Sequence, residues 1–134
     1  MPITVTRDLS GKMRQVIQIR DHRVIADASV EQGGEDSGAG PHDLYDAALG
    51  ACKAVTVLWY ANRRNIPVRD IQVVVERDNS QEREGTYRLA TTLSLGGDLS
   101  DAQRQELLAV ASKCPIHKLM TEATTEITTT LAGA

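Results

Sequence analysis

The sequence predicts an α+β protein made of antiparallel strands and two helices. One helical pattern spans residues 41–65, and a second, shorter one follows residue 100. Between and before these patterns, apolar and polar residues alternate at a period of two, as in half-buried strands. With 134 residues the chain has the usual length of one domain, so we expect residues 1–134 to form a single domain.

The N-terminal part of the chain has the pattern of short antiparallel strands. After an alternating start, residues 13–20 form an extended, largely apolar run. A turn at Asp21 and His22 is expected to lead into a strand over residues 24–28, which gives a small hairpin or meander. Residues 31–40 hold four glycines without periodicity, so they predict a loop in front of the long helix.

The helical pattern over residues 41–65 carries one of the two cysteines, Cys52, at its centre. Its opposite side is hardly more polar than its apolar face, and a helix that is apolar nearly all round is normally covered on more than one side. Asn65 is expected to form a left-handed cap, and Pro67 prevents continuation of the helix. The apolar face consists of Leu44, Ala47, Ala48, Ala51, Cys52, Val55, Leu58 and Trp59.

Three further strands are expected in the second half of the chain. Residues 71–76 and 87–95 alternate apolar and polar side chains, and a polar loop joins them, which predicts two antiparallel strands. A shorter alternation over residues 127–131 predicts a last strand near the C-terminus.

The second helix begins with a recognisable cap. Ser100 followed by Gln103 fits a capping box, in which each side chain bonds to the backbone of the other residue. The apolar face of this helix ends at Cys114, the second cysteine. Pro115 then interrupts the helix and is expected to open a further short turn.

Charge and composition narrow the classes of function. The net charge of -3 comes from 18 acidic and 15 basic residues that are interspersed along the chain, so no basic stripe indicates nucleic-acid binding. We expect neither a signal peptide nor a membrane span, because no apolar run has the length that either requires. The expected location is the cytoplasm, where two cysteines act as reactive thiols, metal ligands or core residues.

The order of these features resembles the OsmC/Ohr family, the osmotically induced and organic hydroperoxide resistance proteins. The resemblance covers nearly the whole chain and rests on a β-rich start, a Gly-rich loop and three motifs. The motifs are PHDLYDAALGAC at the start of the long helix, IPV at its exit and CPIHKLM after the second helix. The branch within the family that it resembles is the OsmC-like one.

The resemblance implies an intertwined homodimer in which antiparallel sheets from both chains wrap around two long central helices. The residues point in the same direction, because one chain of this length offers few elements to cover a helix that is apolar on both sides. The chain has no Phe and only 3% aromatic residues, so its core must be built from small aliphatic side chains.

The resemblance also implies a thiol-dependent peroxidase. In such an enzyme Cys52 would attack an organic hydroperoxide and become a sulfenic acid, and Cys114 would condense with it to a disulfide. An external dithiol would reduce the disulfide, and no cofactor would be needed. The alternative is that both cysteines are small core residues, which free cysteines often are. The protein would then be a redox-inert or ligand-binding dimer.

A peroxidatic cysteine needs a nearby cation to lower the pKa of its thiol. Related proteins use an arginine from the N-terminal region, held by a carboxylate in a PE motif. Here His42 follows Pro41, so Asp43 is the expected carboxylate, although nine helical residues place it on the opposite side from Cys52. The arginine is expected to be Arg14, and the alternatives are Arg20 and Arg23.

The sequence also bears on a metal site and on a substrate pocket. Cys114 and His117 have the spacing C-x2-H, and Cys52 with His42 would complete four ligands, but structural zinc sites usually show two close pairs, so a metal is not expected. The substrate pocket of a peroxidase would be apolar. Its expected lining residues are Leu49, Val55, Ile116 and Met120.

Overall fold

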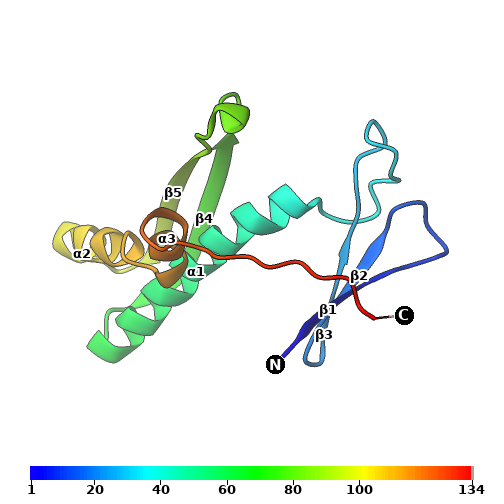
Figure 1. The fold of residues 1–134 in the computed structure, drawn as a ribbon. Coiled ribbons are helices and arrows are strands. Elements are labelled where there is room, and N and C mark those ends of the chain that lie inside the picture. Colours follow the sequence, from blue (N-terminus) through cyan, green and yellow to red (C-terminus); the bar gives the residue numbers. More distant parts are fainter. Residues whose placement is uncertain (134) are drawn as a thin grey trace. The chain divides into compact units, whose positions relative to one another are not determined.

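The computed structural model describes residues 1–133, which form two compact units, one up to Ala48 and one from Leu49 onward. The fold is mixed α+β, with three helices and two antiparallel sheets (Figure 1). It therefore belongs to the class that the sequence predicts. No helix of the described chain is long and apolar enough to cross a membrane.

The first unit contains a three-stranded antiparallel sheet in the order β1-β2-β3. The turn between the last two strands lies at Arg20 and Asp21, one residue earlier than predicted, and Arg20 adopts a φ of 51°. Positive φ is what tight hairpin turns require, and this turn pairs Ile19 directly with His22. The third strand consequently begins at His22 and ends at Ala26. The strands are β1 (Ile3–Arg7), β2 (Gln15–Ile19) and β3 (His22–Ala26).

The loop between β3 and the long helix is organised by Asp27, which is 4% exposed. Its Oδ1 accepts a hydrogen bond from the amide of Ala28, and its Oδ2 accepts from the amides of Glu35 and Ser37 and from the Ser37 hydroxyl. The Ser37 hydroxyl is the largest of the causes that lower the pKa of Asp27 to about 2. The predicted Gly-rich loop is thus held by one ionised carboxylate.

We expect Asp27→Asn to loosen this loop, because an amide accepts fewer and weaker hydrogen bonds than a carboxylate. The folded-state pKa is depressed, so the contribution of Asp27 to stability is complete above the ordinary pKa of 3.8 and is lost as the pH falls toward 2. Hydrogen exchange of residues 31–39 should therefore be faster in the variant at neutral pH, and the difference should vanish in acid. Asp36→Asn, an exposed change in the same loop, is the control; equal exchange in both variants would contradict the prediction.

The long helix α1 (Pro41–Arg64) has the extent that the sequence predicts. Asp43 lies in its first turn, Arg63 and Arg64 lie in its last turn, and Asn65 takes the predicted left-handed conformation with a φ of 54°. The negative charge of Asp43 interacts favourably with the positive N-terminal end of the helix dipole, and the two arginines interact favourably with its negative C-terminal end.

In the second unit, two long strands and two short helices pack against one side of the C-terminal part of α1. Strands β4 (Val68–Asp78) and β5 (Arg88–Gly97) pair antiparallel, and the 3-10 helix η1 (Glu82–Glu84) lies in the loop between them. Helix α2 (Asp101–Ala111) starts with the predicted capping box of Ser100 and Gln103. Helix α3 (Pro115–Thr121) starts at Pro115, so the expected short turn is a helix of two turns.

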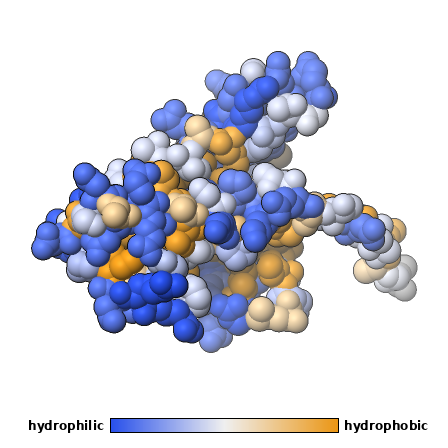
Figure 2. All heavy atoms as spheres, turned by 90° about the vertical axis from the view of Figure 1, so that its left-hand side faces the viewer, coloured by the Kyte–Doolittle hydropathy of each residue, from blue (hydrophilic) through white to orange (hydrophobic). Residues whose placement is uncertain are grey.

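One face of α1 forms the core of this unit. The core consists of Val57, Ala61, Ile66, Leu107 and Ala111. Another face of α1 is uncovered, because Val55 and Trp59 remain 67% and 57% exposed. Figure 2 shows apolar side chains in patches between hydrophilic ones on one face of the molecule. The single chain therefore covers its long helix on one side only.

The predicted C-terminal strand over residues 127–131 does not form. Residues 123–133 contain neither helix nor strand, and Ile127 and Leu131 are 80% and 97% exposed. A strand requires a neighbour to bond with its backbone, and the described part of the chain pairs none with this segment. The prediction of a strand over residues 127–131 is therefore wrong for the described chain.

Candidate functional site

Cys52 lies near the middle of α1 and is partly buried. Its Sγ is 3.9 Å from Oγ1 of Thr56, one helical turn further on. Two residues earlier, Gly50 is buried, and a Cβ at that position would lie 2.9 Å from Cγ2 of Val75. The missing side chain at position 50 therefore lets α1 approach strand β4 closely just before the cysteine.

Cys114 lies at the junction of α2 and α3 and is fully buried. The sequence pattern placed it at the end of the second helix, but that helix ends at Ala111 and Cys114 is the N-cap of α3. Its Sγ accepts a hydrogen bond of 3.4 Å from the amide of His117, which is one of the amides that a helix start leaves without an intrahelical partner. Pro115 suits the first position of this helix because it has no amide proton to satisfy.

The structure places the two cysteines near each other as free thiols, and Cys52 is one of the neighbouring groups that raise the pKa of Cys114. Burial is the largest cause that raises the pKa of Cys114, and the neighbouring Cys52 thiol raises it further. The His117 amide and the positive charge of Lys53 act in the opposite direction. Adjacent thiols of this kind can be oxidised to a disulfide once one of them becomes a sulfenic acid.

Lys53 is the residue of this site that the sequence analysis did not single out. It is only 5% exposed, and its Nζ donates a hydrogen bond of 2.9 Å to the carbonyl of Ala111. The same Nζ lies 2.9 Å from Nδ1 of His117. The available signal was a lysine inside an otherwise apolar helical segment, where charged residues are seldom buried without partners.

The other two predicted site residues belong to the first unit. Arg14 lies just before β2, where its Nε is 3.0 Å from Oδ2 of Asp8 and its Nη2 donates to the hydroxyl of Ser10 at 2.7 Å. Asp43 lies in the first turn of α1, and its Oδ2 accepts a hydrogen bond from the amide of Gly40 at 3.0 Å. A functional link of these two residues to Cys52 stays a prediction.

The alternative arginines lie in the hairpin of β2 and β3. Arg20 occupies the turn, and its Nη1 is 3.7 Å from the sulfur of Met1. Arg23 lies in β3 opposite Gln18. Neither observation favours one of them over Arg14.

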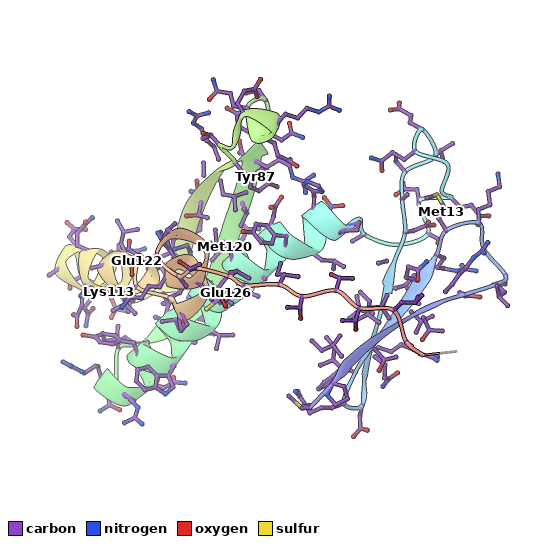
Figure 3. All side chains as sticks on the ribbon, viewed as in Figure 1. Met13, Tyr87, Lys113, Met120, Glu122 and Glu126 are labelled. Atoms are coloured by element: carbon purple, nitrogen blue, oxygen red, sulfur yellow. The ribbon has the colours of Figure 1, made fainter. Side chains whose placement is uncertain are left out.

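A small cavity lies beside the buried lysine in the second unit. Its lining residues are Lys53, Val73, Thr91, Leu93, Leu108, Ala111 and Ser112. The residues predicted to line a substrate pocket are placed elsewhere. Leu49 is buried, Val55 is exposed, and Ile116 and Met120 lie partly buried on α3, where Met120 is labelled in Figure 3. No three His, Cys, Asp or Glu side chains within residues 1–133 are grouped so that they could hold a metal ion.

The sequence matches the family model described as OsmC-like protein over residues 34–130. The chain belongs to the OsmC-like family. This match covers residues 34–40 of the glycine-rich loop, α1 with Cys52, both long strands and the junction with Cys114. A search of curated proteins found no match.

Solved structures with the OsmC-like fold resemble this protein over most of its length. The OsmC like protein from Mycoplasma pneumoniae has 19% identity and a TM-score of 0.72, with 90% of this chain and 86% of that chain covered. The organic hydroperoxide resistance protein OsmC from Legionella pneumophila has 20% identity and a TM-score of 0.64, with 91% and 90% covered. The organic hydroperoxide resistance protein OhrB of Bacillus subtilis has 23% identity and a TM-score of 0.59, with 91% and 92% covered. These similarities establish the OsmC-like fold for this chain.

Proposed function

We propose that this OsmC-like protein is a thiol-dependent peroxidase that reduces organic hydroperoxides through a cycle of two cysteines. The Cys52 thiolate attacks the distal oxygen of the hydroperoxide, the O–O bond breaks, and the alcohol leaves after taking up one proton. Cys52 is then a sulfenic acid, and Cys114 displaces its oxygen as water to form a disulfide. An external dithiol reduces this disulfide and becomes a disulfide itself.

The observation that carries this proposal is that the two free thiols are neighbours, since Cys52 is among the groups that raise the pKa of Cys114. Two small core residues would pack equally well far apart, whereas a two-cysteine cycle needs the second thiol near the first. The two thiols also differ in position and burial, which supports Cys52 as the attacking thiol and Cys114 as the one that follows. Cys52 lies within the continuous helix α1 and is partly accessible, whereas Cys114 is fully buried at a junction of two helices.

The activating cation for Cys52 is proposed to be Arg14, held by Asp43. The resemblance to hydroperoxide resistance proteins supports this assignment, because their nucleophile is paired with an arginine and a carboxylate. His42 occupies the position after Pro41 that holds the family carboxylate, and Asp43 is the nearest carboxylate to it. A guanidinium close to Cys52 would favour its thiolate and orient the hydroperoxide.

The active form is proposed to be an intertwined homodimer. The uncovered face of α1 supports this, since Val55 and Trp59 are large apolar residues left exposed by their own chain. The C-terminal segment also supports it, because its exposed Ile127 and Leu131 would gain a covering surface from a second chain. An interface that buries these groups should exceed the roughly 2,000 Å² that is common for obligate pairs.

Thiol titration with one equivalent of cumene hydroperoxide tests the proposed cycle. We expect two free thiols per chain before the addition and none after it, with both restored by an external dithiol. Cumyl alcohol, which lacks the O–O bond, is the matched control and should leave both thiols free. If cumene hydroperoxide also leaves both thiols free, the protein is the redox-inert, ligand-binding alternative.

A further inference from the structure

The buried side chain of Lys53 ties the turn that carries Cys114 to α1. Lys53 bonds to Ala111, three residues before the cysteine, and to His117, three residues after it. Both contacts measure 2.9 Å, and one of them involves the last residue of α2 while the other involves the first turn of α3. Lys53 therefore holds the junction from both sides of the cysteine.

The buried Nζ of Lys53 has two polar partners. A lysine ammonium only donates, so its contact with Nδ1 of His117 requires the tautomer in which Nδ1 accepts. Placing an ammonium at 5% exposure is costly unless such partners compensate for the lost water. The titratable groups that act on Cys114 are Cys52 and Lys53, while His117 acts through its amide. The positive charge of Lys53 therefore favours the thiolate of Cys114.

We propose that Lys53 is a positioning residue for Cys114, which holds the junction of α2 and α3 against α1 and supplies the positive charge that Cys114 needs when it attacks the Cys52 sulfenic acid. This inference rests on the proposed peroxidase cycle. Each of the two steps then has its own cation. The N-terminal arginine assists the attack of Cys52 on the hydroperoxide, and Lys53 assists the attack of Cys114 on the sulfenic acid.

The second step requires such help because of how Cys114 is placed. In this step the S–H bond of Cys114 and the S–O bond of the sulfenic acid break, the S–S bond forms, and hydroxide leaves and combines with the released proton as water. Cys114 is oxidised and the sulfenic sulfur is reduced by the same electron pair, so no further oxidant is needed. Burial raises the pKa of the Cys114 thiol, and a nearby ammonium opposes this effect.

The first test measures the ionisation of Cys114 without any peroxide. In a Cys52→Ser background only one thiol remains, and its ultraviolet thiolate absorbance is followed against pH. We expect Lys53→Met to move the ionisation of Cys114 to higher pH. Lys113→Met removes the same charge from the exposed residue next to Cys114 in the chain and should leave the ionisation unchanged (Figure 3). An equal titration for both variants would overturn the proposal.

The second test follows the two oxidation steps by mass spectrometry after one equivalent of an organic hydroperoxide, with both cysteines present. We expect Lys53→Met to form the Cys52 sulfenic acid but to form the disulfide roughly tenfold more slowly than the parent, because a smaller fraction of Cys114 is thiolate without the ammonium. Disulfide formation at the parent rate would overturn the role of Lys53. Failure of the parent itself to form a sulfenic acid would instead overturn the peroxidase function, while the pH titration still decides whether Lys53 acts on Cys114.

Substitutions of His117 test the same contact from the other side if Lys53→Met does not fold. His117→Asn keeps a side-chain acceptor close to the position of Nδ1, whereas His117→Leu removes it. We expect disulfide formation in His117→Asn to stay near the parent rate and to slow in His117→Leu. Equal rates in the two variants would show that the contact with Lys53 does not position Cys114.

Discussion

Replacing Cys52 by serine should lower the rate of hydroperoxide consumption by more than roughly a thousandfold, since the variant lacks its nucleophile. Cys114→Ser should behave differently, because the nucleophile remains. That variant should react once and then accumulate Cys52 as a sulfenic acid or, with excess hydroperoxide, as a sulfinic acid. The assignment of roles follows from position, since Cys52 is held within a continuous helix and Cys114 lies where two helices meet.

Single-turnover mass spectrometry of both variants with an organic hydroperoxide distinguishes these outcomes, because each oxidation state of sulfur has its own mass. Serine is nearly isosteric with cysteine, so the two variants are matched controls for each other. Hydroperoxide consumption by Cys52→Ser at the parent rate would show that the roles are wrongly assigned. Absence of any oxidation in the parent and in both variants would show that the pair of thiols is structural.

We expect light scattering at micromolar concentration to give twice the 14.6 kDa mass of one chain. The physical reason is the apolar face of α1 that its own chain leaves exposed. Val55→Glu places a charge on this face and should convert the dimer largely to monomer or prevent stable folding, because a buried unpaired carboxylate is costly.

Gln105→Glu is the matched control for this change. It adds the same negative charge at an exposed position of α2 and should leave the dimer intact. A folded 14.6 kDa monomer for the parent protein would refute the dimer. A Val55→Glu variant that remains a stable dimer would place the interface on another surface.

The features that the sequence predicted best are those that depend on neighbouring residues only. The capping box of Ser100 and Gln103 and the left-handed cap at Asn65 involve residues within one helical turn, and both form as expected. The turn after β2 was placed one residue too late, because the alternation of a strand does not show which residue takes a positive φ. The strand over residues 127–131 failed for a different reason, since a strand depends on a partner that its own pattern cannot specify.

The candidate site was only partly predictable. Both cysteines lie on apolar faces of helical patterns, so their burial could be expected, but their contact depends on how α3 packs on α1. Lys53 could not be assigned from its neighbours, because its partners Ala111 and His117 lie far along the chain and one of them is a backbone carbonyl. The roles of Arg14 and Asp43 rest on resemblance and stay predictions.

Gly50 shows that the site depends on more than the residues that touch a sulfur atom. It contributes no reactive group, but a Cβ there would lie 2.9 Å from Cγ2 of Val75, so we expect a side chain at this position to push α1 and β4 apart. Cys52 would move with the helix, whereas Cys114 is carried by the junction of α2 and α3. We therefore expect a substitution at position 50 to change the separation of the two sulfurs while leaving both thiols and Lys53 in the chain.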